Sequence, residues 1–325
     1  MAVKEENKIE NYKNLITKLF GKNSDILIKD PKDIQIEKFS TGSYLLDRDL
    51  KGGYPKGTLI ELFGGNSSGK TSSCIHAVAE HQSKYPDEPV LWVDLEKVFD
   101  PVYFTNIGID VGSDNFILVR PTAGEDAWET MINFAKTFEN GIIVLDSVAL
   151  LLPKKEDEGM VGDAQMASAA RMNSQGLRKL FPYMKPGGTT VIAINQTRKN
   201  IGGYGDPTVT TGGEAWAFYA RTRIKTSVSK GESGENAIHK FTQVKSNYGK
   251  RDYVTETTIT YGEGFDKTRE LLALCVDEKI IEKGGSWYNY EGVKWQGADS
   301  VVDSLNDNPE LVEELIQKLR ELKVL

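Results

Sequence analysis

The sequence has few of the residues that build disulfide frameworks or zinc sites. Its 325 residues include two cysteines, Cys74 and Cys275, and three histidines, His76, His81 and His239. Two cysteines so far apart exclude a disulfide framework, and we expect two buried thiols in a reducing compartment. His76 and His81 are five positions apart, which does not place them on one helix face, so no zinc site is expected.

Long apolar runs are also missing. The longest, IIVLDSVALLLP at 142–153, contains Asp146 and is too short to cross a bilayer. The first residues, MAVKEENKIENYKN, are charged and contain no apolar signal core. We therefore expect a cytoplasmic protein without a membrane partner. Its length suggests about two domains, and its 39% hydrophobic and 27% charged residues are typical of a globular protein.

Positive charge is outnumbered by negative charge over the whole chain but not within one segment. The chain has 40 Lys and Arg against 47 Asp and Glu, a net charge of −7, which argues against a nucleic-acid-binding protein. Residues 165–230, however, contain ten Lys and Arg and two acids, a net +8 that leaves −15 for the rest. No acid at all occurs in 165–205. This imbalance predicts a polyanion-binding surface in that segment.

The order of apolar runs predicts an α/β fold. Five β-rich runs alternate with helix-compatible stretches, which indicates a mostly parallel sheet; they lie at 58–64, 89–96, 116–121, 142–148 and 189–196. After about residue 220 the predicted strands follow one another directly, at 221–228, 241–246 and 254–262. These three predict an antiparallel extension of the same sheet.

The two ends of the chain differ from this core. Apolar residues at helical spacing predict a helix over 5–20, ended by Gly21. Asp307-Asn308-Pro309 suits the start of a last helix in an α-rich C-terminal part. We therefore predict an N-terminal helix and linker, a core and a small C-terminal domain, at residues 1–38, 39–265 and 266–325.

A phosphate-binding loop is the most specific motif. Residues 64–71, GGNSSGKT, match G-x-x-x-x-G-K-[ST] through Gly64, Gly69, Lys70 and Thr71. Such a loop turns backbone N–H groups and a helix N-terminus toward an anion. Lys70 would reach the β- and γ-phosphates, and Thr71 would supply a hydroxyl to Mg²⁺. The nucleotide would also contact the neighbouring Asn66, Ser67, Ser68 and Ser72.

Polar residues end three of the apolar strands. Asp146 ends IIVLD, the place of a Walker B aspartate that holds Mg²⁺ through water, and Glu96 ends VLWVDLE. Both would point into the crevice where α/β sheets bind ligands. Asp94 shares the strand face of Glu96, and its role stays open. Gln196 ends VIAINQ, where its amide either senses the γ-phosphate or forms a sheet-edge hydrogen bond.

Two segments are candidates for nucleic-acid binding, 153–163 and 198–213. Arg171, Ser174 and Arg178 share one face of a predicted helix over 164–181, directly after the first segment. The second is a long, Gly- and Thr-rich loop, a kind that is usually functional or disordered. Phosphate contacts are expected from its residues Arg198, Lys199, Gly212 and Gly213.

The chain resembles the bacterial RecA recombinases along nearly its whole length, and looks like a divergent member for which a bacteriophage source is one hypothesis. The similar stretches include STGSYLLD (40–47), GGNSSGKT, VDLEKVFDPVYFTNIGID (93–110), LDSVALLLPKKE, GDAQMASAARMNSQGLRKL, INQTRKNIG, TTGGEAWAFYA, YGEG (261–264), GGSWYNYEG (284–292) and DNPELVEELIQKLREL.

The resemblance implies a fold and a set of residue roles. The fold is a RecA-type P-loop ATPase core with a mostly parallel central sheet, a short N-terminal helical segment and a small α-rich C-terminal domain. ATP would lie between protomers of a helical filament, and the N-terminal helix would pack on a neighbour. The implied roles are Glu96 as general base, Gln196 as the link between the γ-phosphate and the second loop, Lys245 as a γ-phosphate contact from the next subunit, and Asp100, Tyr103 and Tyr261 as adenine contacts.

The implied activity is ATP-dependent homologous pairing and strand exchange on single-stranded DNA, with double-stranded DNA as the second substrate. A ring-forming helicase on the same core is one alternative. A DNA-coating or mediator protein that binds ATP with little hydrolysis is another, and a small-molecule kinase is a third.

Three departures from the family pattern bear on these alternatives. Asn247 stands where members have a second lysine, a role for which Lys250 is one candidate substitute, and this puts the hydrolysis rate and its coupling to DNA in question. Glu214 stands where members have an asparagine that helps hold DNA. Members often end in an acidic tail; this sequence ends at Leu325 without one, so we expect less need for Mg²⁺ to relieve self-inhibition.

Overall fold

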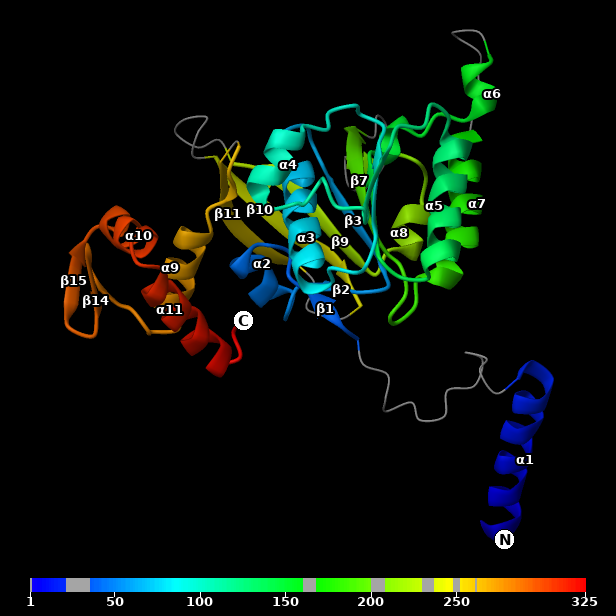
Figure 1. Ribbon diagram of the computed structural model, residues 1–325, viewed down its shortest axis with the longest axis horizontal. Coiled ribbons are helices and arrows are strands. Elements are labelled where there is room, and N and C mark those ends of the chain that lie inside the picture. The colour runs from blue at the N-terminus through cyan, green and yellow to red at the C-terminus, as the bar shows by residue number, and fades with distance from the viewer. Residues whose placement is uncertain are drawn as a thin grey trace. The chain divides into compact units, whose positions relative to one another are not determined.

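A mixed β-sheet organises most of the chain (Figure 1). The computed structural model describes residues 2–21, 36–159, 168–199, 208–229, 237–247, 252–260 and 262–325. The chain divides into two units, residues 1–36 and residues 37–325, and the sheet belongs to the second. No helix within these described ranges is both long and apolar enough to cross a membrane.

The sheet has the strand order β12-β11-β10-β9-β3-β7-β6-β4-β5. Neighbouring strands are parallel from β9 to β5: β9 (Thr222–Val228), β3 (Leu59–Gly64), β7 (Thr190–Lys199), β6 (Ile142–Asp146), β4 (Val90–Asp94) and β5 (Phe116–Val119). The antiparallel extension is β10 (Ile238–Ser246), β11 (Tyr253–Thr260) and β12 (Gly264–Phe265), while β8 (Thr208–Thr210) pairs antiparallel with β7. The predicted α/β fold is therefore confirmed, except that β9 joins the parallel part through β3.

Helices cover both faces of the sheet. On one face lie α3 (Lys70–Lys84) and α4 (Pro101–Ile107), and on the other lie α5 (Gly124–Phe138), α7 (Ser168–Leu180) and α8 (Ala215–Tyr219). Successive strand residues point to opposite faces, so Ile60 packs with the α3 layer and Leu59 with the α5 layer. Burial on both faces explains why these strands are apolar without alternation.

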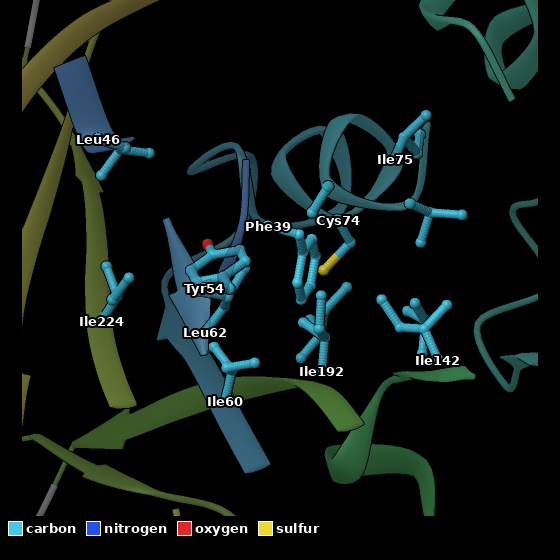
Figure 2. Close-up of a cluster of buried hydrophobic side chains, with 14 of the residues drawn as sticks. Phe39, Leu46, Tyr54, Ile60, Leu62, Cys74, Ile75, Ile142, Ile192 and Ile224 are labelled. Atoms are coloured by element: carbon cyan, nitrogen blue, oxygen red, sulfur yellow. The ribbon is translucent and has the colours of Figure 1, made fainter. Parts of the chain in front are cut away.

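The core on the α3 side includes the first short sheet, β1 (Lys38–Phe39) paired with β2 (Tyr54–Pro55). Figure 2 shows Phe39 and Cys74 against Ile192, with Ile142 beside them. Both cysteines are buried free thiols, as expected. The remaining short helical elements of this part are α2 (Tyr44–Asp49), α6 (Lys154–Asp157) and the 3₁₀ turns Val148–Leu150 and Phe181–Tyr183.

The first unit contains a single helix among its described residues, α1 (Ala2–Phe20). It ends before Gly21, whose φ of +89° suits glycine, and so the predicted stop is confirmed. Apolar side chains of α1 are largely exposed, among them Ile9, Tyr12 and Leu19.

Three helices form most of the C-terminal part: α9 (Lys267–Asp277), α10 (Ala298–Asn306) and α11 (Pro309–Glu321). The Asn308 side chain accepts a hydrogen bond from the Leu311 N–H (3.2 Å), so the predicted helix start is correct. A small antiparallel sheet was not predicted: β13 (Glu282–Gly284), β14 (Trp287–Tyr290) and β15 (Val293–Gln296). Its strands of three or four residues are too short to show a periodic pattern. These elements lie beyond the β11 side of the large sheet (Figure 1).

One buried carboxylate joins the C-terminal part to the core. Glu270 on α9 is 2% exposed and accepts hydrogen bonds from the Ser43 hydroxyl (2.8 Å), the Tyr44 N–H (2.7 Å) and the Thr257 hydroxyl. Ser43 is the N-cap of α2, so the same group fixes the start of that helix. Burial raises the pKa of Glu270 from 4.5 to about 7.

This raised pKa predicts a pH-dependent stability that Glu270→Gln removes. The folded state holds a proton on Glu270 that the unfolded chain releases above about pH 4.5, so the free energy of unfolding falls as pH rises toward about 7. At about 1.4 kcal/mol per pKa unit, Glu270 accounts for about 3 kcal/mol of that fall. Urea unfolding between pH 4.5 and 8 measures it. The exposed neighbour Glu278→Gln serves as the control, and equal pH slopes for Glu270→Gln and the wild type would contradict the assignment.

Candidate nucleotide site and nucleic-acid interface

The phosphate-binding loop connects the central strand β3 to α3, as the sequence predicts. Gly69 has φ +86°, and a Cβ there would lie 2.6 Å from the Ile259 side chain. A Cβ on Gly64 would lie 2.2 Å from the Thr226 carbonyl oxygen. Both positions therefore require glycine: Gly69 because of its positive φ and the nearby Ile259 side chain, and Gly64 because the backbone of β9 approaches closely.

A cavity of about 760 Å³ opens over this loop. Its volume is within the usual range for small-molecule sites. It brings together most of the residues expected to bind nucleotide: Asn66, Ser67, Ser68, Gly69, Lys70, Thr71, Ser72, Glu96, Asp100, Tyr103, Asp146 and Gln196. Gly64 lies at the end of β3, beneath the loop.

Lys70 is largely buried within the loop. Its ammonium donates to the carbonyl oxygen of Gly65 (2.6 Å) and lies 3.4 Å from the hydroxyl of Ser68. Burial lowers the pKa of Lys70. The Ser68 hydroxyl in turn bonds that of Thr226 on β9 (2.6 Å). A phosphate in this cradle would offer the ammonium a charged acceptor in place of a neutral carbonyl.

Asp146 and Thr71 supply oxygen atoms suited to a hard cation. The Thr71 hydroxyl donates to Oδ2 of Asp146 (3.1 Å), and Oδ1 has no hydrogen-bond partner among the described residues. Asp146 is 1% exposed, and its pKa is raised to about 7, first by burial and then by the charge of Glu96. A buried carboxylate oxygen without a donor fits Mg²⁺, which uses one or two carboxylates, water and substrate phosphates.

Glu96 is held by two neighbours on the edge of the cavity. Its Oε1 accepts hydrogen bonds from the Ser147 hydroxyl (2.7 Å) and the Gln196 side-chain amide (3.1 Å). Glu96 and Gln196, each of which ends an apolar run of the sequence, are therefore in direct contact. Ser147 was missed: it follows Asp146 in the chain, and no motif marks it.

Asp94, whose role the sequence left open, supports the turn after β4. It is 1% exposed and accepts from Arg120 Nε (2.9 Å) and the backbone N–H groups of Val98 (3.1 Å) and Phe99 (3.3 Å). These contacts explain a carboxylate at this position without a direct role in the cavity.

The expected adenine contacts lie at the first turn of α4. Asp100 is the N-cap of α4 and accepts from the Val102 N–H (2.9 Å), while the Tyr103 hydroxyl bonds that of Ser72 (2.8 Å). Tyr261 lies outside the described residues. His239 also lines this cavity, and burial lowers its pKa. Nothing in the sequence marked it for this place.

Lys245 does not line the cavity of its own chain. Its ammonium donates to the carbonyl oxygens of Ala217 (2.8 Å) and Phe218 (3.1 Å) on α8. Its expected contact with a γ-phosphate in the next subunit stays a prediction.

Helix α7 carries three of the residues predicted to contact nucleic acid. Arg171 and Arg178 are exposed on this helix and Ser174 is partly buried; Arg198 is exposed on β7. The Asn173 amide donates to the Gly212 carbonyl (3.0 Å), and a Cβ on Gly213 would lie 2.9 Å from that of Ala170. The end of the second segment, at Gly212 and Gly213, is thus packed on α7, the helix that follows the first segment. The side chain of Lys199 and residues 160–167 and 200–207 lie outside the described part of the chain.

Comparison with protein-family models gives two matches. The RecA N-terminal domain matches residues 7–266. The RecA C-terminal domain matches residues 269–323. The chain belongs to the RecA family. It is a RecA-like ATPase in the general sense, of a family whose ATP hydrolysis depends on DNA, and the resemblance first seen in its motifs is confirmed.

In this RecA-family chain we expect Lys70→Ala to weaken ATP binding at least 10-fold. The substitution removes the cation that would face the phosphates, and a hydrogen bond to a charged group is worth about 1.5–3 kcal/mol. Titration calorimetry with Mg-ATP measures the change. Lys84→Ala, at the other end of α3, is the matched control and should bind within 2-fold of the wild type. An unchanged affinity in Lys70→Ala would contradict the assignment of the cradle.

Proposed function

We propose that the chain is an ATP-dependent DNA recombinase, which forms a filament on single-stranded DNA and catalyses homologous pairing and strand exchange in recombination and repair. One observation carries the proposal. Gln196 bonds Glu96 in the nucleotide cavity, and its strand β7 continues directly to Arg198 and the candidate DNA segment. The two sites are therefore consecutive on one strand.

The nucleotide would lie over the residues of the loop that follows β3. Backbone N–H groups of Asn66 to Gly69 and the Lys70 ammonium would bind the β- and γ-phosphates, with Ser72 at the start of α3. Asp100 and Tyr103 would hold the adenine, together with Tyr261. Mg²⁺, held by the Thr71 hydroxyl and by Asp146 through water, would neutralise charge on the phosphates.

Glu96 would act as the general base in hydrolysis. Its carboxylate takes a proton from water as that water attacks the γ-phosphorus, and the bond to the β-phosphate oxygen breaks to leave ADP and phosphate. Ser147 and Gln196 both donate to Oε1 of Glu96, which fixes the direction of the carboxylate. Loss of the γ-phosphate would then free the Gln196 amide and signal to the second segment.

DNA would be held by its phosphates. Arg171, Arg178, Arg198 and Lys199 supply charge, and Ser174 with the backbone N–H groups of Gly212 and Gly213 supplies hydrogen-bond donors. Such contacts carry no sequence information and leave the bases available for pairing with a double-stranded partner.

Neighbouring copies of the chain would complete the site. Lys245 on β10 would contact the γ-phosphate of the next subunit. Beside it, Phe218 is 78% exposed, which suits a surface covered in a filament. The exposed apolar side chains of α1 would pack on an adjacent protomer.

A DNA-coating or mediator protein with little hydrolysis is the second candidate. Glu214 is exposed directly after Gly213, where its charge would repel a phosphate, and Asn247 is exposed at the end of β10 without the charge of a lysine. A ring-forming helicase is a third candidate, which would form hexameric rings that unwind duplex DNA.

The decisive experiment measures ATP hydrolysis with and without single-stranded DNA, alongside electron microscopy of the same samples. We expect DNA to stimulate hydrolysis at least 10-fold and ATP to promote helical filaments. Filaments without stimulated hydrolysis would favour the coating protein. No stimulation together with no filament would rule the proposal out.

Glu96→Gln tests the general base. The amide keeps the size of the side chain but cannot take a proton, and general-base catalysis contributes about 10²–10⁴-fold, so hydrolysis should fall at least 100-fold while ATP and DNA still bind. Phosphate release and filter binding measure the two properties. Glu129→Gln, an exposed acid on α5, should hydrolyse normally. Normal turnover by Glu96→Gln would place the base elsewhere.

A further inference from the structure

A carboxylate lies fully buried where β9, β3 and β7 run side by side. Glu61 on β3 has 0% exposure; its Oε2 accepts from Arg223 Nε on β9 (2.5 Å), and its Oε1 accepts from the Asn195 amide on β7 (2.8 Å). A buried ion pair is weak grounds for stability, because apolar residues of similar volume often replace one without loss. Stability alone therefore does not explain why a carboxylate is buried between Arg223 and Asn195.

The Asn195 side chain uses all its hydrogen-bonding groups. Its Nδ2 donates to Glu61 and to the Thr211 carbonyl (3.0 Å), and its Oδ1 accepts from the Thr211 hydroxyl (2.5 Å) and the Gln196 N–H (2.9 Å). A carboxylate can only accept hydrogen bonds. Glu61 therefore dictates that the NH₂ end of the amide faces it and that Oδ1 faces Gln196 and Thr211.

Asn195 in this orientation joins the two sides of the second candidate DNA segment. Gln196 lies just before the segment and Thr211 lies near its end, and the Thr211 N–H also donates to the Gln196 carbonyl (3.2 Å). The side chain of Gln196 reaches Glu96 in the nucleotide cavity. If bound nucleotide displaces Gln196, the movement would thus be transmitted through Asn195 to Thr211, near the end of the segment.

We propose that Glu61 is a positioning residue that couples the nucleotide site to the second DNA segment by fixing the orientation of Asn195. This inference rests on the proposed function, in which Gln196 responds to the γ-phosphate. Arg223 holds the second oxygen of Glu61 and so keeps the carboxylate aimed at Asn195.

Glu61→Gln tests the proposal with almost no change of shape. The amide NH₂ of the variant must face either Arg223 or the Asn195 NH₂, both of which are donors. Because the charged Arg223 binds the amide oxygen more strongly than the neutral Asn195 does, the NH₂ faces Asn195, which then turns or loses a partner. Hydrogen exchange of residues 208–213 with and without a non-hydrolysable ATP analogue reports the coupling directly. In the wild type we expect the analogue to slow exchange at least 5-fold, and in Glu61→Gln less than 2-fold.

The second readout is hydrolysis. In Glu61→Gln the rate without DNA and the affinity for the ATP analogue should stay within 2-fold of the wild type, while stimulation by single-stranded DNA falls at least 10-fold. Equal losses with and without DNA would show a general defect and overturn the proposal. If the wild type shows no stimulation, the proposed recombinase function fails, and the exchange experiment still decides whether Glu61 couples the two regions.

Asp49→Asn is a matched control. Asp49 is also a buried carboxylate that accepts from an arginine Nε (Arg48, 3.0 Å) and from a second donor (the Thr255 hydroxyl, 2.5 Å), but it lies on α2. Asp49→Asn should keep both the exchange response and the stimulation. If Asp49→Asn lost as much of the exchange response and of the stimulation as Glu61→Gln, any buried group left unpaired would have the same effect. That result would overturn the proposal.

Two further variants keep the test decisive. In an Asn195→Ala background, Glu61→Gln should reduce the exchange response no further, because both act through the same amide; independent, multiplied losses would overturn the proposal. Should Glu61→Gln fail to fold, the apolar pair Glu61→Leu with Arg223→Leu removes both charges together. That double variant should lose the response, and a wild-type response from it would equally overturn the proposal.

Discussion

The parallel pairing of β3 with strands on both sides is the constraint on which the rest of the structure depends. Its register places Gly64 beside Gln196 of β7 and Thr226 of β9, and the next pair of strands places Asp94 beside Asp146. Carboxyl ends of parallel strands open into a common crevice. The register therefore brings the start of the phosphate-binding loop, the amide of Gln196 and the buried acids to one edge of the sheet. A shift of one residue would turn each side chain to the opposite face.

More acids than cations are buried at this edge of the sheet, and this excess determines the electrostatics of the site. Asp146 carries no ion pair with a described residue, and the nearby charges of Glu96 and Asp94 raise its pKa after burial has done so. Asp94 is compensated by Arg120, outside the cavity. The charge of Lys70 acts in the opposite direction on the pKa of Asp146, and burial lowers the pKa of Lys70 itself. The excess of buried negative charge beside a cradle for phosphate is an arrangement that a divalent cation would balance.

The sequence predicts features that depend on local pattern and misses those that depend on register between strands. The strand–loop–helix around Lys70 and the strand-end acids Glu96 and Asp146 follow from motif and periodicity, and in the structure these residues line one cavity. Glu61 gave no such signal, because a single acid inside LIELFG matches no motif. Its partners come from β7 and β9, 134 and 162 residues away in the chain, and a single sequence does not show which strands pair. The parallel alignment of β9 was missed for the same reason.

The local charge counted from the sequence must likewise be corrected for ion pairs with acids from other segments of the chain. Counting charges over 165–230 treats ten cations as equivalent, but Arg223 is neutralised by Glu61 and Lys179 lies 3.3 Å from Glu129, both acids from other segments. Arg171, Arg178 and Arg198 are exposed and form no ion pair with another described residue. Attraction of a polyanion depends on the exposed, uncompensated cations rather than on their number in the sequence. The basic segment thus contains both paired cations, such as Arg223 inside the sheet, and exposed arginines on α7 and β7 whose charge is directed to solvent.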